Sequence, residues 1–272
     1  MFSFLLATLL ITAPSRSFHP GQTLVVGAVT GSRHSPVLIW KNKIVPFYAS
    51  RQGSWRALTR VPLDETSGEK ELEVESYIGE SRKIIRQPFK IQIVSVQFGH
   101  ETLHFGIEKA LLLNDPSEDE ESQVILGSLK TISKDRKQYW KGRFGRPVKG
   151  IISSRYGIKR EKVGQKKADF HKGVDFIAAL GEPIKAPNQG IVILVRDFKF
   201  HGKTVVLNHG QGLGSIYIHL NNILVKEGEK VKKGETLGEV GTTGLATAPH
   251  LHWGVYVHAE PVDPEQWLEE EF

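Results

Sequence analysis

The chain has 272 residues, of which 39% are hydrophobic and 24% charged, and this balance indicates a folded protein rather than a disordered one. It contains no cysteine, which excludes disulfides, iron–sulfur clusters and zinc sites built on thiolates. The formal net charge is +6, and the length suffices for one large domain or two ordinary ones.

Residues 1–17 predict an export signal. Phe2–Ala13 is an apolar run interrupted only by serine and threonine, and it is shorter than the roughly 20 residues that a membrane-spanning helix needs. Ser15-Arg16-Ser17 follows as a small-x-small cleavage site. We expect a signal peptide, a mature protein without a transmembrane segment, and a periplasmic, secreted or cell-envelope location. Because no Lys or Arg precedes the run, the alternatives are a buried first strand or an uncleaved anchor.

Residues 18–110 have the alternating and β-branched composition of short strands, separated by turn-forming clusters such as DETSGE at 64–69. They contain no cluster of residues typical of a catalytic site. We expect a small antiparallel sandwich or barrel-like domain, with strands at Gln22–Val29, Val37–Phe47, Glu71–Ile78 and Phe89–Val96.

Residues 111–140 predict a helical connector. Acidic residues at its start precede apolar residues with helical spacing, namely Val124, Ile125, Leu129 and Ile132. Residues 141–272 return to a β pattern, which predicts a C-terminal antiparallel β-sheet domain and makes the whole chain mainly β. Its expected strands are Ile151–Tyr156, Gly190–Arg196, Lys203–Asn208, Ser215–His219, Thr236–Val240 and Leu251–His258.

The segment Lys141–Lys172 is strongly basic, with eleven Lys or Arg residues and two acids. Such a segment indicates either an anionic partner or a solvated surface. No nucleic-acid-binding motif accompanies it, so we expect no nucleic-acid partner.

Two histidines near the C-terminus, His250 and His252, are separated by one residue. In a strand, residues i and i+2 point to the same face, so both imidazoles project to one side. They can share a metal ion or act as a ligand and a base. The alternative is that one faces solvent and the other is a hydrogen-bonded core residue.

His171 and Asp175 lie four residues apart in FHKGVDF. A straight strand would separate them by about 13 Å, too far for both to reach one zinc ion at about 2 Å. The segment is a poor helix, so it must bend if both are ligands, and Gly173 permits a close turn. The alternative is a turn histidine beside a capping aspartate.

Together, His171, Asp175 and His252 would supply two imidazoles and one carboxylate, the composition of a catalytic zinc site with an open position for water. His219, in SIYIHL, and His250 would then remain to move a proton and stabilise an oxyanion.

The C-terminal motifs resemble those of the LytM/lysostaphin-type zinc endopeptidases. The resemblance covers most of residues 146–267 and rests on HKGVD at 171–175, GEPIKAPNQG at 181–190, SIYIHL at 215–220, VKEGEKVKKGETLGEVGTTG at 225–244 and TAPHLHW at 247–253. It implies one Zn²⁺ per chain held by His171, Asp175 and His252, with His219 and His250 as the catalytic pair. Residues 20–108, through WRALTRVPLDETSG at 55–68, are similar to a β domain that precedes the catalytic domain in some exported members.

The resemblance also implies a substrate and a reaction, the hydrolysis of peptide crosslinks or bridges in bacterial peptidoglycan by zinc-activated water. Three further residues are expected to contact the substrate: Arg155 and Tyr156, which border the groove in this family, and Tyr217, which shares a strand face with His219. Tyr217 can equally be strand packing.

Two other functions fit parts of the sequence. A non-catalytic regulator of this fold would activate cell-wall amidases, with those enzymes as partners, but its zinc residues are usually lost and here they are intact. A lipoyl or biotinyl carrier domain has similar glycines and lysines, but it needs a hairpin-tip lysine motif that this chain lacks.

Overall fold

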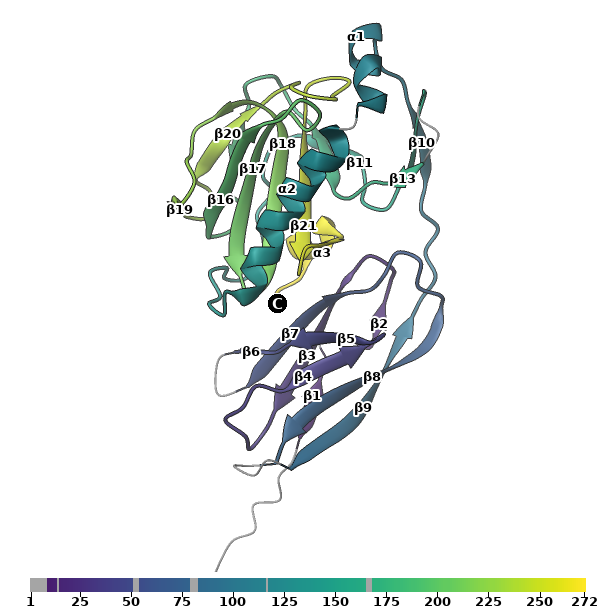
Figure 1. The fold of residues 1–272 in the computed structure, drawn as a ribbon, viewed down its shortest axis with the longest axis vertical. Helices are drawn as coiled ribbons and strands as arrows, with labels where there is room; N and C mark the ends of the chain where they lie inside the picture. Colours follow the sequence, from purple (N-terminus) through teal and green to yellow (C-terminus); the bar gives the residue numbers. More distant parts are fainter. Residues whose placement is uncertain (1–8, 14, 51–53, 79–82, 116, 165–167) are drawn as a thin grey trace, which may run out of the picture. The chain divides into compact units, whose positions relative to one another are not determined.

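The computed structural model describes residues 9–272 except 14, 51–53, 79–82, 116 and 165–167. The chain forms two compact units, Met1–Val96 and Gln97–Phe272, called here the N-terminal and C-terminal units (Figure 1). Each is built mainly from antiparallel sheets, so the expected mainly β fold class is confirmed.

The N-terminal unit is a β-sandwich of two sheets. The first has the order β1 (Leu10–Thr12), β3 (Thr23–Val29), β7 (Trp55–Arg60), β6 (Tyr48–Ala49). The second has the order β2 (Ser17–Phe18), β9 (Ile84–Ile93), β8 (Gly68–Tyr77), β4 (Val37–Trp40), β5 (Lys43–Pro46). Alternate residues of both sheets, among them Leu24, Val26, Leu38, Leu72 and Ile91, form one core.

Part of the predicted signal segment is a strand in this unit. Leu10–Thr12 pairs with β3, and the neighbouring Leu9 is buried in the core. Residues 1–8 and 14 lie outside the described residues. Among the residues that the structure describes, no helix combines the length and the apolar character needed to cross a membrane.

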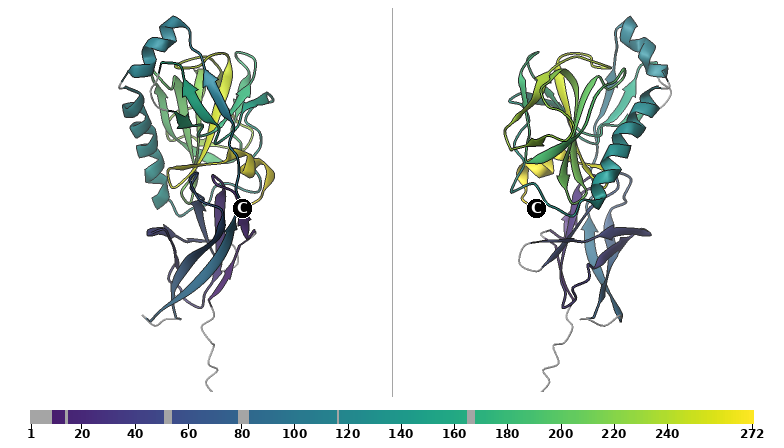
Figure 2. Two further views of the ribbon diagram at one scale, coloured as in Figure 1. Left: turned by 90° about the vertical axis from the view of Figure 1, so that its right-hand side faces the viewer. Right: turned by 60° about the vertical axis from the view of Figure 1, so that its left-hand side comes forward.

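The C-terminal unit includes the segment that the sequence predicts to be a connector. It begins with β10 (His100–Leu103), α1 (Ile107–Ala110), the 3₁₀ helix η2 (Leu111–Asn114), α2 (Ser117–Thr131) and the 3₁₀ helix η3 (Ile132–Lys134). Helix α2 runs along one face of the large sheet in each view (Figures 1 and 2). Its Ile125 and Leu129 are four residues apart and so share a helix face, and they pack on Leu194, Val206 and Ile216.

Among the described residues, the large sheet of this unit has ten strands. Its main order is β11 (Ile151–Ser154), β14 (Val174–Ile177), β21 (His250–Val257), β18 (Leu213–Ile223), β17 (Lys203–Gly210), β16 (Gly190–Asp197), β19 (Lys230–Val231). Off this path lie β15 (Pro183–Lys185), β20 (Thr236–Val240) and β22 (Glu260–Val262), followed by helix α3 (Pro264–Glu269).

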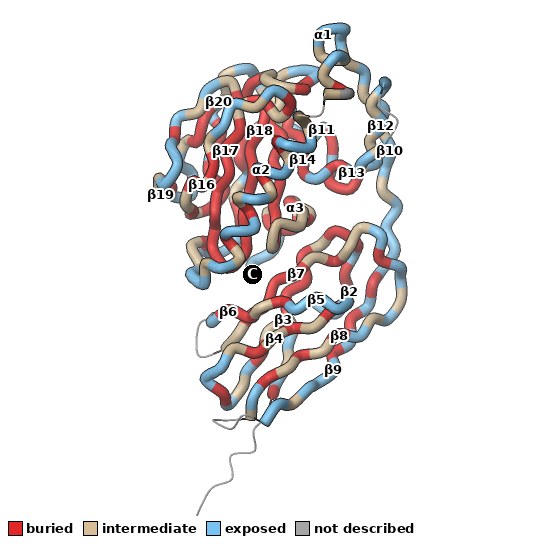
Figure 3. Tube along the Cα trace, viewed as in Figure 1, coloured by how far each residue is buried: buried red, intermediate tan, exposed pale blue. Residues whose placement is uncertain are grey.

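A small sheet lies beside it in the same unit. β10 pairs in parallel with β12 (Lys159–Lys162), which pairs antiparallel with β13 (Asp169–Phe170). In the large sheet, β17 and β18 are buried along most of their length (Figure 3). Three adjacent strands, β14, β21 and β18, carry Asp175, His250, His252 and His219 of the candidate site, with Asp175 opposite His252 and His252 opposite Ile218.

Candidate functional site

The chain bends between β13 and β14, where His171 precedes Asp175. Gly173 lies within this bend, and a Cβ atom there would be 2.5 Å from the carbonyl oxygen of Trp253 and 2.7 Å from Nε2 of His252. Only glycine permits such a close approach to the backbone of β21. The curvature that a shared ligand site requires is therefore present, and it depends on Gly173.

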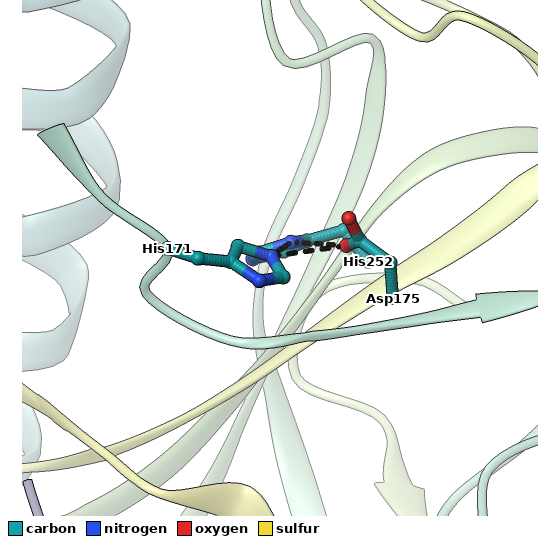
Figure 4. A group of neighbouring side chains, drawn as sticks. All are labelled: His171, Asp175 and His252. Carbon is teal, nitrogen blue, oxygen red and sulfur yellow. Dashed lines mark hydrogen bonds and ion pairs between the residues drawn. The ribbon is translucent and has the colours of Figure 1, made fainter. Parts of the chain in front are cut away.

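The bend brings three possible metal ligands to one point (Figure 4). Nε2 of His171 is 2.9 Å from Nδ1 of His252 and 3.1 Å from Oδ1 of Asp175, and the same Oδ1 is 2.8 Å from Nδ1 of His252. All three residues are buried, with exposed fractions of 2% for His171, 6% for Asp175 and 8% for His252. His171 comes from the turn before β14, Asp175 from β14 and His252 from β21, which is 77 residues further along the chain than Asp175.

A hydrogen bond from Nδ1 of His171 to the backbone fixes the orientation of the His171 ring. Nδ1 lies 2.9 Å from the carbonyl oxygen of Arg155, and because a carbonyl can only accept, Nδ1 carries the hydrogen. The lone pair of neutral His171 is therefore on Nε2, which faces Asp175. Such a backbone contact is the usual way in which a metal-binding histidine is oriented.

The electrostatics of the cluster suit a cation. Burial alone would raise the pKa of Asp175, but the adjacent imidazoles of His171 and His252 hold that pKa well below its usual range. Burial lowers the pKa of His252 to about 4 against the opposing effect of Asp175. At neutral pH the cluster therefore offers an ionised carboxylate and an unprotonated imidazole, as metal ligation requires.

The donor set fits zinc. Imidazole nitrogens and a carboxylate oxygen bind zinc at about 2.0–2.2 Å, so ligand atoms of a tetrahedral site lie about 3.3 Å apart. The three atoms here lie at most 3.1 Å from one another, and small outward movements would accommodate an ion. With three protein ligands, the fourth position remains for water or substrate.

His219 and His250 lie together beside this cluster. Their ring centroids are 4.9 Å apart. Nδ1 of His219 donates to the carbonyl oxygen of Thr243 at 2.8 Å, and Nδ1 of His250 donates to that of Ala248 at 2.8 Å. Each contact leaves Nε2 as the nitrogen available to another group.

His219 has two unusual properties. Its backbone lies in the left-handed region, with φ of 68°, which is uncommon for a residue other than glycine and frequent at functional sites. Burial, reinforced by the neighbouring imidazoles of His250 and His252, lowers the pKa of His219 well below the usual value. At physiological pH His219 is therefore neutral, with an unprotonated Nε2 facing the groove.

A groove of about 250 Å³ joins the two groups of side chains. It is lined by Asp175, His252, His219 and His250. His171, the third member of the possible ligand set, is not part of the lining. The segment from β10 to Phe105 and the loop before β21 form other parts of its wall, with Glu101, Leu103, Phe105, Leu245, Thr247, Ala248 and Pro249.

Arg160 and Glu101 belong to the site but were not predicted from the sequence. Nη2 of Arg160 donates to Oδ2 of Asp175 at 2.5 Å, and its Nε bonds to Glu101. Glu101 in turn accepts a hydrogen bond of 3.0 Å from Ser154. No sequence spacing links these residues, because β10 and β12 meet only through parallel pairing. Arg160 thus holds the carboxylate oxygen of Asp175 that does not face the two imidazoles.

The three residues expected to contact the substrate, Tyr217, Tyr156 and Arg155, do not line the groove. Tyr217 is fully buried, and its hydroxyl is 2.8 Å from Oγ of Ser215. Tyr156 is buried and donates to the carbonyl oxygen of Pro261 at 2.8 Å. Arg155 forms an ion pair with Glu265. The left-handed backbone of His219 interrupts the alternation of side chains along β18. Tyr217 and His219 therefore do not lie on one face: His219 lines the groove, whereas Tyr217 is buried.

Comparison with known proteins places this site in context. Residues 169–264 match the family described as peptidase family M23. The peptidoglycan DD-endopeptidase ShyA of Vibrio cholerae is 38% identical over 112 residues, which are 41% of this chain and 26% of that protein. The DD-carboxypeptidase/endopeptidase Mpg of Neisseria meningitidis is 35% identical over 95 residues, 35% of this chain and 22% of that protein. The matches thus cover about a quarter of these relatives' length.

A solved structure resembles more of the chain. A crystal structure described as a peptidase M23 from Pseudomonas aeruginosa superposes with a TM-score of 0.62 and 28% identity, covering 92% of this chain and 93% of that one. The residues that match the family include His171, Asp175, His219, His250 and His252. The C-terminal unit of this chain therefore carries a domain of peptidase family M23.

Proposed function

We propose that this protein is an exported zinc metalloendopeptidase that hydrolyses peptide bonds in the crosslinks or bridges of bacterial peptidoglycan. The observation that carries the proposal is the convergence of His171, Asp175 and His252 at one edge of a groove that also contains His219 and His250. Relatives named as peptidoglycan endopeptidases support the substrate class.

In this proposal His171, Asp175 and His252 hold the zinc ion. When bound, zinc supplies a Lewis acid that lowers the pKa of water and polarises a carbonyl group. The protein's part is to orient the ligands, through the contact of His171 with Arg155 and that of Asp175 with Arg160. These contacts reduce the reorganisation needed when the ion binds.

His219 and His250 then move the proton. The unprotonated Nε2 of one imidazole takes a proton as water attacks the carbonyl carbon of the scissile peptide. The resulting imidazolium can hydrogen-bond to the developing oxyanion, and it then transfers its Nε2 proton to the leaving amine nitrogen as the C–N bond breaks. The backbone contacts at Thr243 and Ala248 keep both rings in the required tautomer.

The proposal is tested by digesting purified sacculi with the full chain and zinc, and by analysing the released muropeptides. His219→Ala should retain one zinc ion per chain and lose about 10²–10⁴ in rate, whereas His171→Ala should lose zinc and activity together. His34→Ala, in the N-terminal unit, is the control. A zinc-loaded chain that releases no cleaved muropeptide would refute the proposal, and amidase stimulation that persists in His219→Ala would instead indicate a regulator.

A further inference from the structure

Glu121 of helix α2 is a buried carboxylate that accepts four different N–H groups. Its Oε1 accepts from the backbone nitrogens of Lys199 at 2.8 Å and Phe200 at 3.0 Å. Its Oε2 accepts from the backbone nitrogen of His201 at 3.0 Å and from Nδ1 of the same residue at 2.8 Å. Three successive backbone N–H groups around one anion form a concavity that fixes the conformation of the loop.

The loop held by Glu121, residues 198–202 between β16 and β17, contacts the backbone of His219. The N–H of His219 donates to the carbonyl oxygen of His201 at 3.2 Å. This contact helps to hold His219 in its left-handed conformation, which costs about 1–3 kcal/mol unless the surroundings impose it.

The same loop also supports the residue that orients the His219 ring. A Cβ atom on Gly202 would lie 2.5 Å from the carbonyl carbon of Thr243, and Leu245 donates its N–H to the carbonyl oxygen of Phe200 at 2.7 Å. Thr243 in turn accepts the hydrogen bond from Nδ1 of His219. Both the backbone and the tautomer of His219 therefore depend on the position of loop 198–202.

We propose that Glu121 is a positioning residue for His219, so that one side chain of helix α2 acts on the site although it lies outside the residues that match family M23. Glu121 fixes loop 198–202, the loop fixes the backbone of His219 and the position of Thr243, and these contacts aim Nε2 of His219 into the groove. The role rests on the proposed peptidase function.

The substitution Glu121→Gln isolates this role because it keeps the shape of the side chain. All the partners of the carboxylate are donors, so the amide NH₂ would face a donor and leave it unpaired. The loop should shift, and a displacement of about 1 Å at a catalytic group can cost about 10²-fold in rate. We expect kcat to fall by about 10-fold to 10²-fold, with KM and zinc content unchanged.

Glu118→Gln is the matched control. Glu118 lies one turn earlier on α2 and pairs with Lys162 at 3.0 Å, so its substitution also removes a charge from the helix but leaves the carboxylate of Glu121 in place. Its kcat should remain within about twofold of the unchanged chain, since exposed or half-exposed ion pairs contribute little.

The experiment measures kcat and KM on a soluble crosslinked muropeptide with the zinc-loaded full chain, and the ¹⁵N resonances of the His219 ring without substrate. Glu121→Gln should lower kcat and shift His219 away from the Nδ1–H tautomer. Glu121→Asp keeps the charge, so its effects on kcat and on the tautomer should be smaller. Glu121→Asp replaces Glu121→Gln in the test if the glutamine variant does not fold. Unchanged kcat and His219 resonances in these variants, or an equal loss in Glu118→Gln, would overturn the role. If the unchanged chain cleaves nothing, the proposed function fails, while the ring resonances still test the positioning.

Discussion

Gly173→Ala tests whether the bend before β14 sets the geometry of the proposed metal centre. The added Cβ would lie 2.7 Å from Nε2 of His252, and reaching ordinary contact at 3.4 Å requires a displacement of about 0.7 Å. Metal sites tolerate deviations of only about 0.2 Å. We therefore expect zinc affinity to fall by about 10-fold to 100-fold, as for other changes that misplace a ligand, with a loss of about 1–3 kcal/mol in stability from overpacking.

Zinc affinity is measured by competition with a chelating indicator, and stability by urea denaturation of the metal-free chain. Gly145→Ala is the control, because its Cβ would meet no atom closer than 3.5 Å. If Gly173→Ala binds zinc as tightly as the unchanged chain, then the close packing of the bend against His252 does not determine the site, and the reasoning is refuted.

Three further substitutions probe other parts of the C-terminal unit. Arg160→Gln should weaken zinc binding by about 10-fold to 100-fold because Asp175 loses a charged partner; equal affinity in a chelator competition would count against this. Burial lowers the pKa of His209 to about 4, so the unfolded state takes up the proton first and stability falls as the pH drops from about 6.5 to 4, by about 3 kcal/mol. His209→Gln should remove that part of the acid destabilisation in urea titrations of the zinc-free chain. Tyr217→Phe should leave KM unchanged and cost about 1 kcal/mol of stability; a raised KM would support the expected substrate contact of Tyr217.

Short-range rules explain why parts of the proposed ligand set, His171, Asp175 and His252, could be anticipated from the sequence. The predicted strand Leu251–His258 corresponds to β21 (His250–Val257), in which His250 and His252 were expected to share a face. The four-residue spacing of His171 and Asp175 required a bend, for which Gly173 was the evident position. That these residues, 81 apart at the extremes, lie within hydrogen-bonding distance follows from strand pairing, which only the family resemblance could anticipate.

The remaining features depend on long-range contacts that spacing does not reveal. Helix α2 was predicted from its periodicity, but its role in holding loop 198–202 rests on Glu121, whose partners are 78 to 80 residues away. Strand alternation predicts that Tyr217 and His219 share a face. The positive φ of His219 interrupts this alternation, which the sequence does not reveal. The Arg160–Glu101 contact joins strands that pair in parallel, so it leaves no local signal.

X-ray absorption at the zinc edge, on the full chain loaded with one equivalent of zinc, tests the metal centre most directly. We predict one ion per chain with two imidazole ligands and oxygen ligands at about 2.0–2.2 Å, and loss of this spectrum when His171, Asp175 or His252 is replaced by alanine. A spectrum that survives all three substitutions, or zinc bound without histidine, would show that the ion lies elsewhere.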